Sequence, residues 1–277
     1  MSHLEAWIAG VFGLLIGSFL NVCIQRWPRD LSVVRPRSRC NDCESPIAWF
    51  DNVPLGSYIA LGGRCRNCAA RIPWRYPLVE ALTAFAFAWF VWHLGVGVAG
   101  LKYCLFSAIT IGLIFCDLET LILPDEFTLG GTLLGVAFSL FTPVADSMFR
   151  LLASLSGFAP GPRVASLGES LLGAALPAGS LWLVGWLFER IRHKEGLGFG
   201  DVKMIAMAGA FLGLRGALFT VILGSLLGSI IGLAWIRLTG KDAADYPLPF
   251  ATFLGIAALV VAAEGPRFFN LYSQITQ

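Results

Sequence analysis

The sequence predicts an all-α polytopic membrane protein with about eight transmembrane helices and one small polar loop domain that contains four cysteines. Of the 277 residues, 56% are hydrophobic and only 14% are charged, and the mean hydropathy is +0.72. Several apolar runs are long enough to cross a bilayer as helices. The basic residues are unevenly distributed, since nine of the twenty lie between Arg26 and Arg75. These observations exclude a soluble globular domain and indicate how the chain is oriented.

The first apolar run, residues 7–23, is predicted to be a retained transmembrane helix. No Lys or Arg precedes it, whereas Arg26 and Arg29 follow it. A cleavable signal peptide has the opposite arrangement, with a basic start and a cleavage site of small residues. The positive-inside rule therefore places the N-terminus outside and residues 25–76 in the cytoplasm.

Seven further segments continue the alternation across the membrane. They are residues 77–94, 101–116, 127–140, 167–188, 201–214, 216–236 and 247–261. Residues 201–214 are short for a complete span. In this arrangement both termini lie outside, and fifteen of the twenty basic residues lie on the cytoplasmic side. Residues 142–166 are expected to form an external segment with an interfacial helix.

Three domains follow from this topology. Residues 1–25 are the first transmembrane helix, residues 26–76 are a cytoplasmic four-cysteine domain, and residues 77–277 are a membrane-embedded domain of about seven helices. Glycines at spacings of four in the last helices, such as Gly209, Gly213, Gly224 and Gly228, predict close helix packing.

The cytoplasmic loop contains two Cys-x-x-Cys pairs, Cys40 with Cys43 and Cys65 with Cys68, separated by twenty-one residues. This spacing is typical of a tetrahedral four-thiolate zinc site. The alternatives are a disulfide pair or unrelated thiols, and the reducing cytoplasm disfavours a disulfide. Four protein thiolates leave no open coordination position, so the zinc ion is expected to be structural and to stabilise a loop too small to fold alone.

Two aspartates beside apolar segments, Asp117 and Asp201, are the candidate catalytic residues. Both lie at predicted cytoplasmic helix ends. An aspartate at the centre of a membrane helix costs about 2.5–3.5 kcal/mol, and less near the interface. Asp117 is expected at the negative end of a helix dipole, with nothing local to neutralise it. Two carboxyl groups that share a proton can activate water for attack on a peptide bond. In that hypothesis Asp201 is the base and Asp117 the acid.

A glycine loop precedes Asp201. Gly196, Gly198 and Gly200 fall within the five residues before it, which exceeds what a helix cap requires. These glycines predict either positive φ or close approach of another part of the chain. The loop is therefore expected to position Asp201.

Asp125 follows Pro124 at the start of another predicted helix, where an acidic residue is also expected on structural grounds alone. It is therefore a weaker candidate than the other two aspartates. The residues interpreted as possible support for the active site are Asp125, Gly198, Gly200 and Lys203.

Seven stretches resemble the bacterial type IV prepilin leader peptidases, which are bifunctional membrane aspartic proteases of the Gly-x-Gly-Asp class. They are residues 17–28 (GSFLNVCIQRWP), 36–40 (PRSRC), 51–54 (DNVP), 63–68 (GRCRNC), 74–80 (WRYPLVE), 117–125 (DLETLILPD) and 195–203 (EGLGFGDVK). The resemblance extends over essentially the whole chain, and Asp117 and Asp201 match the two protease aspartates of the family.

The resemblance implies an enzyme of the bacterial inner membrane whose active site faces the cytoplasm. It implies cleavage of the basic leader of prepilins or pseudopilins after a glycine, followed by N-methylation of the new terminal residue with S-adenosylmethionine. The chain has no glycine fingerprint of a nucleotide-binding βαβ unit. The cofactor-binding residues are therefore unknown, with candidates near Asn21, Arg26 and the zinc loop. The expected partners are the pilin substrates and the lipid bilayer, with no nucleic acid.

Two other functions stay open. One is a prepilin peptidase that cleaves without methylating. The other is a transporter with intramembrane aspartates, whose ionisable residues should approach the midplane and connect both faces. Acidic side chains predicted to attract the basic leader are Glu119, Asp125, Glu126 and Glu195. The sequence does not indicate which pilin is processed, whether the system is a pilus or a secretion machine, or the oligomeric state.

Overall fold

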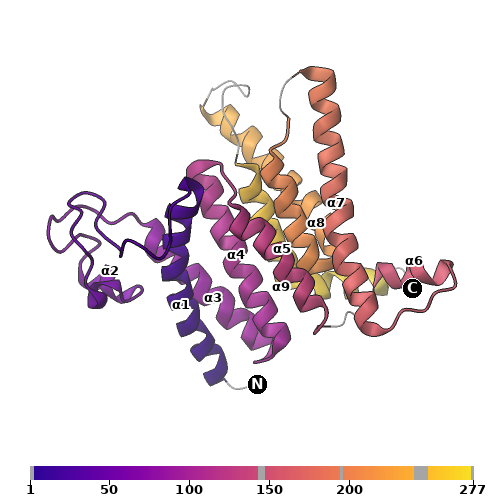
Figure 1. Ribbon diagram of the computed structural model, residues 1–277, viewed down its shortest axis with the longest axis horizontal. Helices are drawn as coiled ribbons and strands as arrows, with labels where there is room; N and C mark the ends of the chain where they lie inside the picture. Colours follow the sequence, from indigo (N-terminus) through magenta and orange to yellow (C-terminus); the bar gives the residue numbers. More distant parts are fainter. Residues whose placement is uncertain (1–2, 143–146, 194–195, 240–248, 276–277) are drawn as a thin grey trace. The chain divides into compact units, whose positions relative to one another are not determined.

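Figure 1 shows a computed structural model, which describes residues 3–142, 147–193, 196–239 and 249–275. The helices are α1 (His3–Arg26), α2 (Gly56–Ala60), α3 (Arg75–Leu94), α4 (Val98–Thr120), α5 (Asp125–Ser139), α6 (Met148–Leu155), α7 (Pro162–Arg192), α8 (Phe199–Thr239) and α9 (Phe250–Ile275), with short 3-10 turns η1 (Trp27–Arg29) and η2 (Trp49–Asn52). The described residues contain no strand, so the all-α prediction is confirmed. Glu195 of the glycine motif and Pro247 of the last predicted span lie outside these ranges.

Five helical segments of the described chain are long and apolar enough to cross a membrane. They are His3–Arg29, Arg75–Leu94, Val98–Thr120, Pro162–Arg192 and Phe199–Ala234. Helix α5 has 15 residues, about 22 Å at 1.5 Å per residue, which is shorter than a hydrocarbon core of about 30 Å. The apolar part of α9, Phe250–Glu264, is short as well. The chain is thus a membrane protein, but the predicted count of eight spans is not confirmed.

The chain divides into two compact units, Met1–Gly112 and Leu113–Gln277. In the first unit α1 and α3 pack against each other through glycine. A Cβ added to Gly13 would lie 2.6 Å from the Ala84 Cα, and one added to Gly17 would lie 2.7 Å from the Glu80 Cα. Real side chains do not fit at such distances, so these glycines allow the two backbones to touch. The loop between the two helices contains the four cysteines and α2.

The second unit packs α7, α5 and α9 around α8. A Cβ on Gly209 of α8 would lie 1.9 Å from the Gly173 carbonyl oxygen of α7, and one on Gly224 would lie 3.0 Å from the Leu254 Cα of α9. On α5, a Cβ on Gly135 would lie 2.8 Å from the Ala210 Cβ. The predicted role of the spaced glycines in close helix packing is confirmed for this unit.

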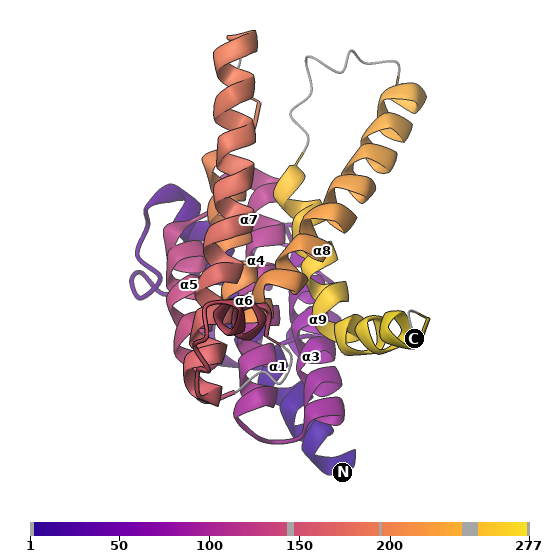
Figure 2. The same cartoon turned by 90° about the vertical axis from the view of Figure 1, so that its right-hand side faces the viewer.

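Helix α8 bends at Gly213, which has φ 74° and ψ −179°. The bend separates two arms that point in different directions in Figure 2, and it agrees with the two segments predicted before and after residue 215. Glu169 of α7 caps the second arm, since its Oε1 accepts the Leu214 N–H at 3.0 Å. Its Oε2 accepts the Ser147 hydroxyl and the Phe149 N–H at the start of α6. One buried carboxyl group thus satisfies the backbone of two helix starts.

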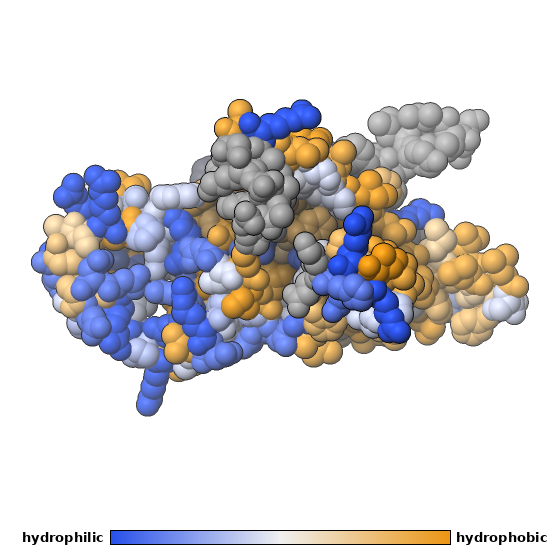
Figure 3. Space-filling model, turned by 90° about the horizontal axis from the view of Figure 1, so that it is seen from above, coloured by the Kyte–Doolittle hydropathy of each residue, from blue (hydrophilic) through white to orange (hydrophobic). Residues whose placement is uncertain are grey.

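The surface separates into polar and apolar regions. In Figure 3, hydrophilic side chains gather over the loop between α1 and α3, whereas hydrophobic side chains cover much of the visible helical part. Several large apolar side chains on the helices are largely exposed, for example Trp7 at 76% and Leu133 at 72%. Exposed apolar surface of this extent is stable in lipid rather than in water.

Candidate functional site

The two candidate aspartates lie together in the second unit. Asp117 is in the last turn of α4 and Asp201 is in the first turn of α8. The carboxyl group of Asp117 is buried, that of Asp201 is partly accessible, and the two are close enough to repel each other electrostatically. Residues that are 84 positions apart in the sequence, 117 and 201, are therefore neighbours. Neighbouring carboxyl groups are the starting requirement for a pair that shares a proton, either directly or through a water molecule.

Asp117 has a partner that the sequence analysis missed. Its Oδ2 accepts the Thr252 backbone N–H at 2.7 Å and the Thr252 hydroxyl at 2.9 Å. Thr252 lies in the first turn of α9, so the positive end of that helix also faces Asp117. Nothing in the neighbouring sequence was expected to neutralise Asp117, and its hydrogen-bond donors come instead from 135 residues further along the chain. Both carboxyl groups therefore lie near the positive end of a helix, so the helix dipoles do not indicate which aspartate is the acid and which is the base.

The glycine loop is required for close approach and not for unusual backbone angles. A Cβ on Gly198 would lie 3.3 Å from the Asp201 Oδ2, and one on Gly200 would lie 3.1 Å from the Leu123 Cδ1. Neither glycine has a positive φ. The Gly198 carbonyl accepts the Asp201 N–H at 3.1 Å. A larger side chain at either position would therefore push against the aspartate or against the loop before α5.

Asp125 and Lys203 form an ion pair that joins α5 to α8. The Lys203 ammonium contacts Asp125 Oδ1, and the Thr128 hydroxyl donates to the same oxygen at 3.4 Å. The Asp125 side chain is 59% exposed and that of Lys203 is 20% exposed. Lys203 follows Asp201 by two residues, so the pair anchors the first turn of α8 next to the aspartates. Both residues are placed to position the site rather than to carry its chemistry.

The four cysteines of the first unit converge on one point. The Sγ atoms of Cys40, Cys43, Cys65 and Cys68 lie within 4.8 Å of one another. The Cys40 and Cys68 Sγ atoms are 3.8 Å apart, which matches the separation of about 3.8 Å expected for tetrahedral bonds of about 2.3 Å. None of these four cysteines forms a disulfide in the structure, which disfavours the disulfide alternative. The donor set fits zinc.

The two cysteine pairs form the same turn. In each turn the residue after the second cysteine has a left-handed φ, 55° at Glu44 and 57° at Ala69. The N–H of the first cysteine donates to the carbonyl five residues later, 3.0 Å for Cys40 and 2.8 Å for Cys65. The repeat, offset by twenty-five residues, brings both pairs to the ion with the same geometry.

The electrostatics of the thiols also fit a bound cation. Hydrogen bonds from Ser45 lower the pKa of Cys43 to about 6. The Ala70 N–H acts to lower the pKa of Cys68, but desolvation and the three neighbouring thiols raise that pKa to about 12. Four sulfurs at this distance do not all ionise without a compensating positive charge. Zinc supplies that charge.

A bidentate ion pair supports the same loop. Arg66, inside the second cysteine turn, donates from Nε to the Asp51 Oδ2 at 2.8 Å and from Nη2 to Oδ1 at 2.6 Å. These bonds hold the pKa of the Asp51 carboxyl below its usual value. The Arg66 guanidinium also lies 5.5 Å from the centre of the Phe50 ring. Asp51, which lies between the two turns in the sequence, is therefore fastened to the second of them.

Comparison with known proteins identifies two matching family models. The model described as the bacterial peptidase A24 N-terminal domain matches residues 11–94, and the type IV leader peptidase family model matches residues 104–233. Similar proteins named prepilin leader peptidase/N-methyltransferase occur in Pseudomonas aeruginosa (33% identical, 95% of this chain and 92% of the relative), Aeromonas hydrophila (34%, 95% and 91%) and Xanthomonas campestris (33%, 95% and 93%). No solved structure matches the chain.

Proposed function

The chain belongs to the type IV leader peptidase family, and from that premise we propose that it removes the leader peptide of prepilins or pseudopilins and N-methylates the new N-terminus. Asp117 and Asp201 are the proposed catalytic residues. The observation that carries the peptidase half is the proximity of these two carboxyl groups, one held by Thr252 and the other by the glycine loop.

The proposed reaction uses one proton shared by the two aspartates. The ionised carboxyl group takes a proton from a water molecule, whose oxygen attacks the carbonyl carbon of the scissile peptide bond. The protonated carboxyl group donates its proton to the carbonyl oxygen. When the tetrahedral intermediate collapses, the C–N bond breaks and the leaving nitrogen takes the proton that the first carboxyl group removed from water, which yields a free α-amine. The hydroxyl group formed from the carbonyl oxygen returns its proton to the second carboxyl group, so the pair again holds one proton. Because Asp117 Oδ2 already accepts two hydrogen bonds, a shared proton on Asp117 is assigned to Oδ1.

The surroundings of the pair suit a peptide substrate. Gly198 and Gly200 let the start of α8 pack closely against the Asp201 carboxyl group and against Leu123 of the loop before α5, which holds Asp201 at the end of the helix. Glu119, Asp125 and Glu126 are exposed near this end of α4 and α5. We propose that they attract the basic leader, so that neutralising them lowers the cleavage rate and its salt dependence.

The four-cysteine cluster is proposed to hold a structural zinc ion. Cys40, Cys43, Cys65 and Cys68 fill the tetrahedral positions, which leaves none for water or substrate. The ion would fix the two turns of a loop that has little apolar core of its own, since neither η2 nor α2 contains a buried residue. S-adenosylmethionine is the proposed methyl donor, and it would supply a methyl group on a positively charged sulfur.

The proposed location is the bacterial inner membrane, with the aspartates facing the cytoplasm. The support is the charge distribution, because fifteen of the twenty basic residues fall on that side of the predicted topology. Alkaline phosphatase fused after Phe158 in the predicted external segment should be active, and the same fusion after Arg66 should be inactive. The reverse pattern would overturn this orientation.

The test of function compares the wild type with Asp117→Asn and Asp201→Asn on a prepilin in detergent, with cleavage scored by mobility and methylation by mass. Each change should abolish cleavage, while a pre-cleaved pilin is still methylated. Asp30→Asn, an exposed aspartate of the first unit, is the matched control and should cleave normally. Cleavage that survives in either variant would rule out the carboxyl pair. A cleaved pilin without the added methyl group would leave a peptidase alone.

A further inference from the structure

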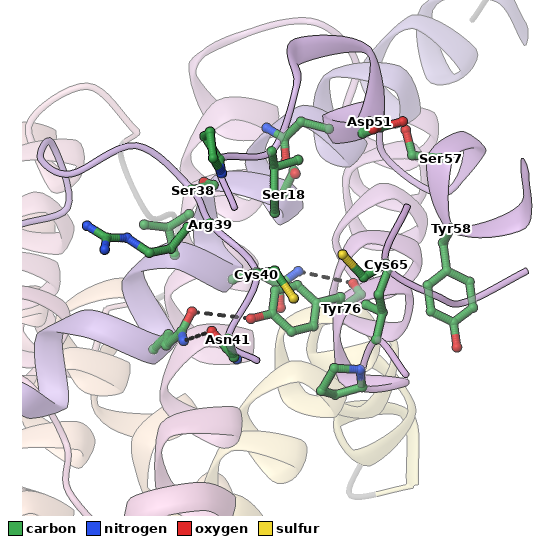
Figure 4. A pocket seen from close by; sticks show the side chains of 18 of the residues that line it. Ser18, Ser38, Arg39, Cys40, Asn41, Asp51, Ser57, Tyr58, Cys65 and Tyr76 are labelled. Atoms are coloured by element: carbon green, nitrogen blue, oxygen red, sulfur yellow. Dashed lines mark hydrogen bonds between the residues drawn. The ribbon is translucent and has the colours of Figure 1, made fainter. Parts of the chain in front are cut away.

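The first unit contains a cavity of about 550 Å³ between α1, α3 and the four-cysteine loop. Its volume lies within the range of about 300–1,000 Å³ that is usual for small-molecule sites. Figure 4 shows side chains from α1, the loop and α3 around it, among them Ser18, Asn41, Tyr58 and Tyr76. The proposed peptidase reaction uses none of these residues, so the cavity needs another explanation.

Asn21 on the cavity wall has an unused hydrogen-bond acceptor. The side chain is 1% exposed, and its Nδ2 donates to the Tyr76 carbonyl at 3.0 Å and to the Gly17 carbonyl at 3.2 Å. These two bonds fix the amide orientation. The Oδ1 atom has no partner among the described residues. Buried polar atoms are nearly always paired, so an unpaired one beside a cavity indicates a ligand that donates a hydrogen bond.

Glu80 places a second acceptor beside it. Glu80 of α3 lies against Gly17 of α1, and Gly17 is one helical turn before Asn21. Its side chain is buried, and Oε2 accepts the Leu55 N–H at 2.8 Å. Leu55 has φ 56°, which is uncommon for a residue with a side chain, so this contact holds the loop in a costly conformation at the cavity wall. The carboxyl group therefore shapes the cavity and places an acidic group beside Asn21, in a wall that elsewhere contains six arginines, namely Arg26, Arg29, Arg35, Arg39, Arg66 and Arg71.

A chain of hydrogen bonds connects the cavity to the first cysteine turn. The Tyr76 hydroxyl donates to Gln25 Oε1 at 3.2 Å, and Gln25 Nε2 donates to Asn41 Oδ1 at 3.1 Å (Figure 4). Asn41 lies between the zinc-ligand candidates Cys40 and Cys43. The wall of the cavity is thus formed jointly by the two helices and the loop that the ion is proposed to fold.

We propose that this cavity binds the S-adenosyl methyl donor, with Asn21 and Glu80 as binding residues for its hydrogen-bond donors and positive charge. The donor's ammonium, sulfonium and ribose hydroxyl groups match these two acceptors, and the rings of Phe50, Tyr58 and Tyr76, which also line the cavity, match its adenine. This inference rests on the methyltransferase half of the proposed function and assigns it a place in the first unit.

Equilibrium binding to the full-length protein in detergent tests the inference. The probes are S-adenosylmethionine and S-adenosylhomocysteine, measured by calorimetry. Ala48 lines the cavity, so Ala48→Phe fills it whereas Ala48→Ser leaves it open. Glu80→Gln removes the carboxyl charge, and Glu189→Gln, an exposed position on α7, is its control. We expect Ala48→Phe and Glu80→Gln to weaken binding at least tenfold and both controls to bind as the wild type does.

Zinc content and prepilin cleavage are measured on every variant to verify that it folds. If the wild type binds and methylates but Ala48→Phe and Glu80→Gln bind equally well, the donor site lies elsewhere and the inference is wrong. If the wild type neither binds either probe nor methylates a pre-cleaved pilin, the methyltransferase half of the proposed function fails, and the inference fails with it. Binding that weakens in the controls as much as in the cavity variants would also overturn it.

Discussion

Thr252→Val tests whether the hydrogen bonds to Asp117 matter for cleavage. The Thr252 hydroxyl lies 2.9 Å from Asp117 Oδ2 and 3.4 Å from the Ile114 carbonyl, so its single proton is assigned to the carboxyl group. Valine keeps the branched shape and the backbone N–H but removes that donor. A hydrogen bond to a charged group contributes about 1.5–3 kcal/mol. If the bond is made fully only in the reacting state, cleavage should slow by about 10- to 100-fold.

Two controls separate this effect from a general loss of stability. Thr252→Ser retains a hydroxyl and should recover most of the activity. Thr220→Val removes a buried hydroxyl of the same unit that donates to the Gly216 carbonyl of its own helix at 2.8 Å, and it should stay within about twofold of the wild type. The assay is single-turnover cleavage of a prepilin, with thermal unfolding of each variant followed in parallel. Wild-type cleavage by a folded Thr252→Val protein would refute the reasoning.

Three other perturbations follow from the same contacts. Asp125→Asn and Lys203→Met should each slow cleavage by about 2- to 5-fold, which is the scale of a partly exposed ion pair. The double variant should be no slower than either single variant, because both remove the same ion pair. If the two effects multiply instead, the residues do not act through that ion pair. Glu169→Ala should lower the free energy of unfolding by at least about 3 kcal/mol, because it leaves the Leu214 and Phe149 N–H groups without an acceptor. Glu169→Gln keeps an acceptor and should lower the free energy of unfolding by less. Equal losses for the two variants, measured by unfolding in detergent, would argue against the capping role. Metal analysis of the wild type should find one zinc per chain, which Cys43→Ser and Cys68→Ser should lose and Cys23→Ala should keep. Zinc retained by both ligand variants would rule out the four-thiolate site.

The sequence was most informative where a pattern is local. Hydropathy predicted the membrane class, and the spacing of four cysteines predicted a cluster whose Sγ atoms do converge. The predicted separation of residues 201–214 from residues 216–236 corresponds to a bend at Gly213, where glycine adopts φ 74° without strain. Each of these features depends on residues within a short stretch of chain.

Features that depend on distant contacts could not be predicted. Thr252 reaches Asp117 across 135 residues, and Glu169 reaches Leu214 across 45. Thr252 is an ordinary residue of an apolar helix, whereas Glu169 is a carboxyl group inside a predicted span, which marks it as unusual but does not indicate its partner. Only tertiary packing brings each residue to its partner. The predicted number of spans is not confirmed for a related reason, because apolar character predicts that a segment is buried but not that it crosses the bilayer. The sequence did contain one signal for the missed partner of Asp117. Thr252 lies two residues after the start of a helix that follows Pro249, where its N–H group has no acceptor within the helix.

The two proposed reactions must occur in a fixed order, with cleavage before methylation. The nitrogen that is to be methylated belongs to the scissile peptide bond, and an amide nitrogen is a poor nucleophile because its lone pair is delocalised into the carbonyl group. Only the cut made at Asp117 and Asp201 creates the free amine. An Asp117→Asn protein with an intact donor cavity should therefore leave an uncut prepilin unmethylated and still methylate the same pilin supplied without its leader. A variant of the cavity, such as Ala48→Phe, should produce the complementary result, a pilin that is cut but not methylated. If both variants instead lost both activities while folded, the separation of cleavage and methylation into distinct sites would be wrong.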